Sequence, residues 1–393
     1  GLGNYGNYLF INGINVAGTG LATISASGIS FNFGDTITVA DTVVGAATDL
    51  LISSIIKSER VGTKTKAGVG TLTLTGINTD TSPWAITGGT LEIGGAGQLQ
   101  SGSYASTIAN SGTFAYNSSA NQILSGLISG SGALVKNGTG TLDLPEHNTY
   151  SGATTINEGT LKLSGSQKRN LNTTYTVDGA SAVLEAANIQ VFSPFGSSYD
   201  KLLTATNGGT IKASSLAIRL GDVTLHNSSS LTANVANGAY GGFYIGQLAA
   251  AASPTVTVSG SGASRIDGAG DFAIVATIFD VADSTGNTDA DLTVSTALHD
   301  MTDTQFTGNV LIPGAVTKTG SGTMILSGVN NYSGATTVNA GILSLGDSTN
   351  NTNLADASDV TVATGAVVDL NYIGTDIIDE LFLDGDQAAA GTW

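Results

Sequence analysis

Three 28-residue segments align with one another without a gap, and their internal spacing constrains the fold more than any other feature of this chain. They span Lys66–Ile93, Lys136–Leu163 and Lys318–Leu345, and the second and third share 16 of 28 residues. In each copy, two alternating apolar residues recur 19 positions later. The pairs are Leu72/Leu74 with Leu91/Ile93, Leu142/Leu144 with Leu161/Leu163, and Met324/Leu326 with Leu343/Leu345. A chain that returns to the same place every 19 residues or so would stack each pair on the next, so these twelve residues are the predicted core.

Short runs of alternating apolar and polar residues, typical of half-buried strands, occur throughout the chain. Examples are Thr71–Leu74, Thr141–Leu144 and Thr255–Val258. Glycine accounts for 54 of the 393 residues and provides turns between these runs. The pattern predicts an all-β fold. The fixed interval favours a parallel β-solenoid, an elongated rod, over a β-sandwich, which needs no such interval.

Two further positions recur in the repeats. Gly70, Gly140 and Gly322 precede the first apolar pair, where a coil turns a corner and a Cβ does not fit. Asn78, Asn148 and Asn330 share one turn position, and asparagine hydrogen-bonds to its own turn. These residues are therefore expected to be architectural.

Composition excludes several classes of function. The chain contains no cysteine, which excludes disulfides, thiolate metal sites and cysteine nucleophiles. Its net charge is −17, with 11% charged residues, which argues against nucleic-acid binding and against docking on an anionic membrane. No apolar run is long enough for a membrane-spanning helix. The N-terminus lacks an initiator methionine and a basic leader, so a mature, processed end is expected.

The three segments resemble the autotransporter-associated β-strand repeat. Its pattern runs Lys-x-Gly-x-Gly-Thr-Leu-x-Leu, then Asn-x-Tyr-Ser-Gly-x-Thr-x-Val/Ile, then Gly-x-Leu. The second and third copies match closely, whereas Pro83 and Trp84 interrupt the first. Residues 111–136 and 279–300 resemble spacers of the same family, and residues 367–393 resemble its C-terminal end.

The resemblance implies a right-handed parallel β-helix that is secreted and displayed on a bacterial surface. Members of the family are mostly structural or adhesive passengers without shared catalytic residues. The expected organisation is an uncharged N-terminal segment with the first coils (1–65), a solenoid body (66–345) and acidic C-terminal coils (346–393).

Enzymes on β-helices need clustered carboxylates, usually with a nearby cation. The richest acidic cluster is Asp280, Asp283, Asp289 and Asp291, a weak calcium candidate without the register of a calcium loop. The histidines at 147, 226 and 299 lack metal-ligand spacing, and only four arginines are present. No catalytic residue, cofactor site or further metal is predicted, and the chain is not expected to be an enzyme.

The two ends differ in charge. No charged residue occurs among the first 34, and an aromatic and aliphatic run begins the chain; the predicted subunit-interface residues are Tyr5, Tyr8, Leu9, Phe10 and Ile11. Such a strand either folds back to cap its own coil or pairs with a neighbouring subunit. No Lys or Arg follows Lys318, whereas nine acidic residues do. This asymmetry favours head-to-tail joining of subunits, which generates open filaments.

The sequence thus predicts an extracellular or cell-surface structural protein that self-associates into a filament or coat through its terminal strands. The alternative is a monomeric adhesin or carbohydrate-binding passenger that binds host or matrix glycans through an exposed aromatic stripe, with Tyr116, Tyr150 and Tyr332 as candidates. A polysaccharide lyase or hydrolase is the third hypothesis. Neither nucleic acid nor a membrane span is expected.

Overall fold

The computed structural model describes residues 8–10, 12–32, 35–43, 45, 47–57, 61–165, 173–188, 203–215, 218–235, 242–246, 253–303, 310–346, 354, 358–373, 375–389 and 391. These residues contain one short 3₁₀ turn, Gln100–Gly102, and no α-helix. The chain forms two compact units: unit 1 is Gly1–Thr176 with Ala182–Leu184, and unit 2 is Val177–Ser181 with Glu185–Trp393. The three-part division expected from the sequence stays a prediction.

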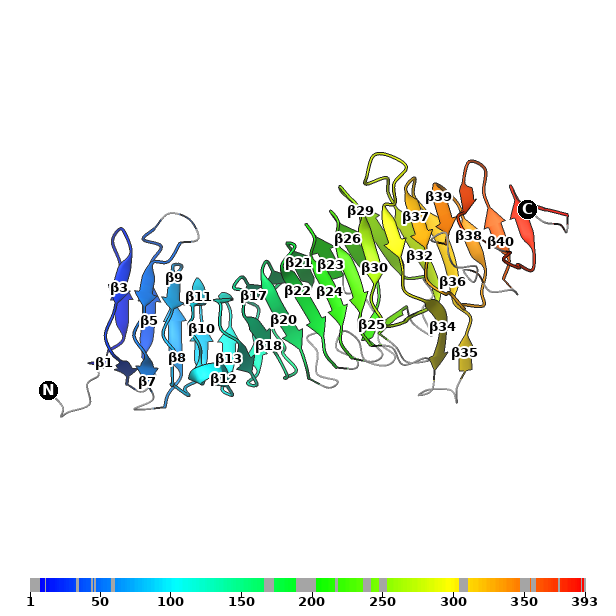
Figure 1. Ribbon diagram of the computed structural model, residues 1–393. Coiled ribbons are helices and arrows are strands. Elements are labelled where there is room, and N and C mark those ends of the chain that lie inside the picture. The colour runs from blue at the N-terminus through cyan, green and yellow to red at the C-terminus, as the bar shows by residue number, and fades with distance from the viewer. Residues whose placement is uncertain are drawn as a thin grey trace. The chain divides into compact units, whose positions relative to one another are not determined.

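Unit 1 is a coil whose turns add parallel strands to the same sheets (Figure 1). Sheet 1a contains β1 (Tyr8–Phe10), β4 (Ile29–Phe31) and β7 (Ile56–Lys57). Sheet 1b contains β2 (Ile14–Val16), β5 (Thr36–Val39), β8 (Lys64–Ala67), β10 (Trp84–Ile86), β13 (Ile108–Asn110) and β16 (Ile128–Ser129). Sheet 1c contains β3 (Ala22–Ile24), β6 (Leu50–Ile52), β9 (Thr71–Leu74), β11 (Thr90–Gly95), β14 (Thr113–Ser118), β17 (Ala133–Lys136) and β19 (Thr154–Ile156). Sheet 1d contains β12 (Ser103–Tyr104), β15 (Gln122–Leu124), β18 (Thr141–Asp143) and β20 (Gly159–Leu163). Strands β21 (Tyr175–Asp178) and β22 (Ala182–Ala186) each contain residues of both units.

Unit 2 is also a coil of parallel strands, and its strands form three sheets. Sheet 2a contains β23 (Leu203–Thr206), β26 (Val223–His226), β29 (Thr255–Ser259), β32 (Ala276–Val281), β36 (Ala315–Thr319), β38 (Thr336–Val338), β40 (Val360–Val362), β42 (Leu381–Leu383) and β43 (Asp386–Gln387). Sheet 2b contains β24 (Thr210–Ala213), β27 (Ser230–Ala233), β30 (Ser264–Asp267), β33 (Leu292–Val294), β37 (Thr323–Leu326), β39 (Ile342–Leu345) and β41 (Val367–Leu370). Sheet 2c contains β25 (Ile218–Leu220), β28 (Phe243–Ile245), β31 (Phe272–Ile274), β34 (Leu298–Asp303) and β35 (Val310–Ile312). The predicted all-β parallel solenoid is therefore confirmed.

The interior of the coil consists of aliphatic residues stacked on like residues. Leu72 is in register with Leu91, Leu142 with Leu161, and Met324 with Leu343, and all six side chains are fully buried. The second residue of each pair stacks in the same way for Leu74 on Ile93 and Leu326 on Leu345. Alternate residues face water, since a strand turns successive side chains to opposite sides. A 19-residue period therefore corresponds to one turn of this coil.

The three repeats do not occupy equivalent sides of the coil. The first repeat places its lysine strand in sheet 1b and its Leu-x-Leu strand in sheet 1c. In the second repeat the lysine strand lies in sheet 1c and the Leu-x-Leu strand in sheet 1d. In unit 2 the third repeat uses sheets 2a and 2b. The repeat therefore encodes two neighbouring strands and the corner that joins them, independent of which sides they form.

Candidate functional site

The first residue of each repeat is a lysine with a fully buried side chain, a placement that lysine rarely takes in proteins. Each ammonium group donates to backbone carbonyls of its own corner and of the next turn. Lys66 Nζ lies 3.0 Å from the oxygens of Ala67, Gly68 and Gly88. Lys318 Nζ lies 2.8 Å from those of Thr319 and Gly320 and 3.1 Å from that of Ala340. Lys136 Nζ donates to Gly138 and, at 2.9 Å, to Glu158. The carbonyls replace the water that the cation loses on burial.

Burial lowers the pKa of each of these three lysines to about 8 from the usual 10.5. A nearby carboxylate opposes the shift in each case. Asp49 raises the pKa of Lys66, Glu158 raises that of Lys136, and Asp280 and Asp291 raise that of Lys318. The lysine is thus a costly cation at a fixed place in each repeat.

The glycine before the Leu-x-Leu strand lies where the previous turn leaves no room for a side chain. A Cβ on Gly70 would lie 2.2 Å from the oxygen of Ala40, and a Cβ on Gly140 would lie 2.0 Å from that of Ala120. A Cβ on Gly322 would lie 2.3 Å from the oxygen of Ala282. The predicted corner role of these glycines therefore has a steric cause.

The threonine after this glycine donates its amide to a side chain of the previous turn. Thr71 N–H lies 2.7 Å from Asp49 Oδ2, and Thr323 N–H lies 2.7 Å from Asp291 Oδ2. The second repeat uses an amide instead, at 2.8 Å from Thr141 N to Asn121 Oδ1. An acceptor one turn away thus fixes the start of the strand.

Asp291, one of the four calcium candidates, is fully buried and its carboxylate is occupied by protein donors. Its Oδ1 accepts from the amides and hydroxyls of Ser284 and Thr285 at 2.7–3.0 Å. Asp49 Oδ1 likewise accepts from the amides of Thr42 and Val43 and from the Thr42 hydroxyl. Burial raises the pKa of both aspartates, but the backbone hydrogen bonds outweigh it and both pKa values are lowered. A carboxylate held this way serves as a turn clamp.

The other three calcium candidates do not join Asp291 at one point. Asp280 accepts from Thr319 Oγ1 at 3.0 Å, and Asp283 accepts from the Gly286 amide at 2.7 Å. Asp289 contributes its backbone amide to Asn287. Among the residues that the structure describes, no group of three or more His, Asp or Glu side chains is arranged to hold a metal ion. Calcium binding stays a prediction.

The repeated asparagine forms hydrogen bonds with its own turn, as predicted, and also with the neighbouring turn. Asn78 Nδ2 donates to Gly76 at 3.0 Å, and Asn148 Nδ2 donates to Glu146 at 3.3 Å. The Oδ1 atom accepts a strand amide of the previous turn in all three copies. These amides are Ile56 for Asn78 at 2.8 Å, Ile128 for Asn148 at 2.7 Å and Leu298 for Asn330 at 2.9 Å. One side chain thus continues the backbone ladder around the corner.

The exposed aromatic stripe expected for glycan binding is wrong, because Tyr116, Tyr150 and Tyr332 are all buried. Tyr150 Oη lies 2.7 Å from Thr154 Oγ1, and Tyr332 Oη lies 2.7 Å from the Thr336 hydroxyl. Tyr116 donates to the Ala120 carbonyl at 2.8 Å. Tyr150 and Tyr332 each follow the repeated asparagine by two residues, and their side chains lie on the inner side of the turn that this asparagine holds.

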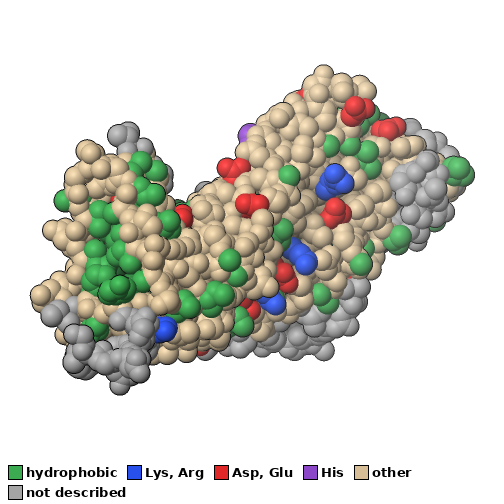
Figure 2. All heavy atoms as spheres, turned by 60° about the vertical axis from the view of Figure 1, so that its left-hand side comes forward, with side chains coloured by type: hydrophobic (Ala, Val, Ile, Leu, Met, Phe, Trp, Pro, Cys, Tyr) green, Lys and Arg blue, Asp and Glu red, His purple; other side chains and the backbone are tan. Residues whose placement is uncertain are grey.

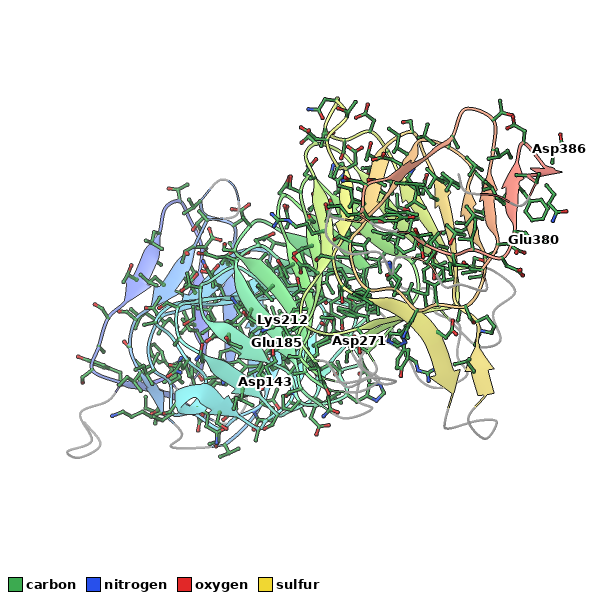
Figure 3. The ribbon with its side chains drawn as sticks, turned by 45° about the vertical axis from the view of Figure 1, so that its right-hand side comes forward. Asp143, Glu185, Lys212, Asp271, Glu380 and Asp386 are labelled. Atoms are coloured by element: carbon green, nitrogen blue, oxygen red, sulfur yellow. The ribbon has the colours of Figure 1, made fainter. Side chains whose placement is uncertain are left out.

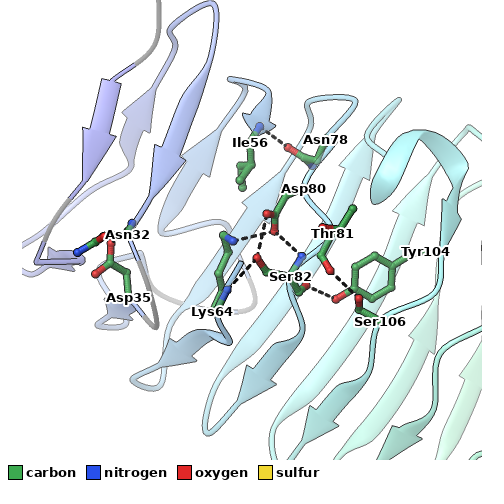
Figure 4. Close-up of polar contacts among 11 residues, drawn as sticks. Asn32, Asp35, Ile56, Lys64, Asn78, Asp80, Thr81, Ser82, Tyr104 and Ser106 are labelled. Carbon is green, nitrogen blue, oxygen red and sulfur yellow. Dashed lines mark hydrogen bonds and ion pairs between the residues drawn. The ribbon is translucent and has the colours of Figure 1, made fainter. Parts of the chain in front are cut away.

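In the first repeat, Asp80 stands at the position of the tyrosine and Trp84 at that of the threonine, and Asp80 forms an ion pair with Lys64, which precedes the repeat. Lys64 Nζ lies 2.8 Å from Asp80 Oδ2, and both side chains are buried (Figure 4). Ser82 Oγ donates to Asp80 Oδ1 at 3.0 Å, and Tyr104 Oη donates to the Ser82 carbonyl at 2.6 Å. Asp80 and Ser82, two positions at which this copy differs from the other two, thus belong to one buried polar network with Lys64 and Tyr104, which lie outside the repeat.

Sheet 2c carries a second layer that sequence analysis missed. In β25, β28 and β31 the middle residue, which faces away from the coil, is buried like its neighbours. These residues are Arg219, Tyr244 and Ala273, and Arg219 lies over the Tyr244 ring at 5.7 Å. Tyr244 and Ala273 pack with Val275 and Met301, and Ile312 of β35 packs against this cluster. The signal in the sequence is the absence of the usual polar middle residue in FYI and FAI.

Charged side chains lie on several strands of the coil, among them the labelled Asp143, Glu185 and Lys212 (Figure 3). Lys212 Nζ lies 3.8 Å from Glu185 Oε2 at a partly exposed position, and Asp143 is in register with Lys162. His226 Nδ1 lies 3.1 Å from Ser259 Oγ, and His299 Nδ1 lies 2.8 Å from the Asp300 carbonyl. Neither of these two contacts joins a histidine to both a nucleophile and an orienting carboxylate. The described residues include no helix that is long and apolar enough to span a membrane.

At the N-terminal end, Tyr5 and Ile11 lie outside the described residues. Tyr8, Leu9 and Phe10 form β1, which pairs in parallel with β4, and the Phe10 ring stacks on Phe31 at 5.5 Å. Tyr8 is 70% exposed, while Leu9 and Phe10 are half-buried. The predicted role of this segment as a subunit interface stays a prediction.

Comparison with known proteins agrees with the repeats. Residues 65–93, 134–163 and 316–345 match the passenger-associated-transport-repeat family. The chain is 33% identical over 159 residues to the adhesin BmaC autotransporter of Brucella suis biovar 1 (strain 1330). This alignment covers 35% of the chain and 5% of that protein, so the chain corresponds to a small part of its relative. No solved structure matches the chain. The chain is a β-solenoid protein with three repeats that match the passenger-associated-transport-repeat family, in agreement with the resemblance found in its sequence.

Proposed function

We propose that this chain is the extracellular scaffold of a non-enzymatic, surface-displayed adhesin. The observation that carries the proposal is the use of the repeat residues. The lysine, glycine, asparagine and tyrosine that define the repeat all turn inward or bind the neighbouring turn of the coil. These residues hold successive turns of the coil together, which is the role expected in an elongated scaffold. The similarity to an adhesin supports the same function.

We place the adhesive surface on polar residues that face outward and on the hairpin of β34 and β35. Along the outer corners, Asn157 Nδ2 donates to Asn137 Oδ1 at 2.7 Å, and Asn227 Nδ2 donates to Asn207 Oδ1 at 2.9 Å. Such rows of amides and hydroxyls suit the hydroxyl groups of host or matrix glycans. The hairpin extends sheet 2c with an antiparallel strand, and Leu311 on it is 55% exposed.

The test is binding of the purified chain to immobilised glycans and matrix proteins, measured by biolayer interferometry. We expect saturable binding by the chain. A variant in which Gly-Gly replaces residues 302–311 removes the hairpin, and the turn can close because Met301 and Ile312 face each other across the two strands. This variant should lose most of the binding and keep its β-rich circular dichroism.

An enzyme would behave differently in the same samples. Release of reducing or unsaturated sugars from the polysaccharides would overturn the proposal in favour of a hydrolase or lyase. The absence of saturable binding on cells, matrix proteins and glycans alike would also overturn it.

A further inference from the structure

Two core positions of the coil carry opposite charges at the first repeat and no charge at the other two. Two residues before the repeat lysine, the second and third copies have Leu134 and Val316, whose side chains are fully buried. Lys64 stands at this position before the first copy, and Asp80 replaces the buried repeat tyrosine. The two exchanged residues contact each other, so an apolar position and a tyrosine position hold one pair of opposite charges (Figure 4).

This pair lies inside the coil. Lys64 Nζ lies 2.8 Å from Asp80 Oδ2, and the two side chains are 1% and 4% exposed. Figure 2 shows other Lys, Arg, Asp and Glu side chains on an outer face of the molecule, where such residues are usually found. Two aromatic residues neighbour the lysine: Nζ lies 5.9 Å from the centre of the Phe31 ring, and the buried Trp84 is in register with Lys64. Taking two charges out of water is costly, and the other two copies form the same corner without it.

The carboxylate of the pair is held by donors of a single residue. Ser82 Oγ donates to Asp80 Oδ1 at 3.0 Å, and the Ser82 amide donates to Oδ2 at 3.3 Å. Tyr104 Oη in turn donates to the Ser82 carbonyl at 2.6 Å. Donors at both oxygens stabilise the negative charge that develops there when a nucleophile attacks the carboxyl carbon. The nitrogen of Lys64 is already in contact with this group, so the reaction needs no encounter in solution.

We infer that Lys64 and Asp80 condense into an isopeptide bond between Nζ and Cγ. A proton moves from the ammonium to the carboxylate across their contact, and the amine electron pair then attacks Cγ. The bond from Cγ to the hydroxyl oxygen breaks, and the hydroxyl leaves as water with a second proton from Nζ. The products are one amide and one water, with no change in oxidation state or net charge. The reaction is favoured in a buried site because it removes both charges.

The bond joins two successive turns of the coil. Lys64 is the first residue of β8, and the Asp80 amide donates to the carbonyl of Ile56 in β7 at 3.1 Å, which places Asp80 one turn later. A chain without cysteine has no disulfide to hold its turns together, and an amide is not broken by reduction. The inference goes beyond the proposed scaffold function and does not depend on it.

Mass spectrometry of the purified chain of 393 residues, denatured after folding, tests the bond. We expect the intact mass to be lower than that of the sequence by one water molecule. Trypsin cleaves after lysines with a free side chain, so the amide at Lys64 blocks cleavage there. The digest should contain a branched peptide in which residues 61–66 are joined to residues 67–136 through Lys64 and Asp80. Fragmentation of this peptide identifies the two linked residues.

Lys64→Arg is the matched variant, because the guanidinium keeps the positive charge but does not lose the proton that amide formation requires. This variant should have the full mass of its own sequence and give no branched peptide. Lys212 and Glu185 are an internal control in the same digest, since Nζ and Oε2 lie 3.8 Å apart at partly exposed positions. Trypsin should cleave after Lys212.

The unaltered chain decides the question even if the arginine variant does not fold. Its full sequence mass, together with cleavage after Lys64, would overturn the inference. A loss of water that persists in Lys64→Arg would do the same, because the water then leaves from another site. So would a branch that links residues other than 64 and 80.

Discussion

At the scale of single residues, this protein stabilises its corners with side chains that complete backbone hydrogen bonds. The repeat lysine donates to carbonyls, and the asparagine accepts a strand amide of the neighbouring turn. Both are polar groups placed inside a coil where unpaired backbone groups would otherwise be left. The repeat is thus conserved between copies at the positions where the backbone needs a partner.

Asn148 tests this role. Its Oδ1 is the acceptor for the buried Ile128 amide at 2.7 Å. Asn148→Ala leaves that amide without a partner, which should destabilise the coil by about 1–3 kcal/mol. Asn148→Asp keeps the acceptor and should cost less.

Hydrogen exchange at the Ile128 amide measures the effect. We expect exchange to accelerate strongly in Asn148→Ala and weakly in Asn148→Asp. Equal acceleration in the two variants would show that the acceptor is not what matters at this position.

At the scale of elements, the 19-residue interval was enough to predict which strands stack. It identifies Leu142 over Leu161 and Met324 over Leu343 because one turn of the coil has that length inside a repeat. It does not fix the side of the coil, since turns outside the repeats differ in length: Leu91 stacks on Phe114 and Ala22 on Leu50. The same repeat therefore begins on sheet 1b once and on sheet 1c once.

The candidate site was harder to predict than the fold. Tyr150 and Tyr332 follow an asparagine at a turn, and turn residues are usually exposed. Here the asparagine side chain accepts a strand amide of the neighbouring turn, and the tyrosine two residues later lies in the interior. The periodicity of the sequence does not reveal a hydrogen bond between turns. The layer on sheet 2c was missed for a related reason, because it depends on segments that pack outside the coil.

Ile325 and Leu326 are neighbours on β37 whose side chains face opposite sides of the sheet. Leu326 is fully buried and stacks on Leu345, whereas Ile325 faces outward and is half-buried. Leu326→Asp places an unpaired charge in the core and should cost several kcal/mol and unfold neighbouring turns. Ile325→Asp should cost less than about 1 kcal/mol. Limited proteolysis with mass spectrometry should reveal cleavage near residues 326–345 in the first variant only; equal resistance of both would contradict the assigned orientation.

At the scale of the whole molecule, the buried titratable groups of the two units act together on stability. Lys66, Lys136 and Lys318 have folded pKa values of about 8, against 10.5 for a free side chain. Between these two pH values the unfolded chain binds more protons than the folded one. The free energy of unfolding should therefore rise as pH increases from 8 toward 10.

Buried tyrosines reverse this trend at higher pH. Burial raises the pKa of Tyr104, Tyr116 and Tyr332 above the usual 10. Above pH 10 the unfolded chain loses tyrosine protons that the folded chain keeps, so the free energy of unfolding should fall. The two effects together place the maximum of stability near pH 10, well above the range in which most proteins are most stable.

Urea unfolding between pH 7 and 11, followed by circular dichroism, tests this profile. Replacing the three repeat lysines with methionine should flatten the rise between pH 8 and 10 and leave the fall above pH 10. If the triple variant does not fold, each single variant should remove part of the rise. Lys162→Met and Lys212→Met are matched controls because both side chains lie on the outer face, and they should leave the profile unchanged. A rise that persists in the triple variant would mean that groups other than these three lysines produce it, and its assignment to the buried lysines would be wrong.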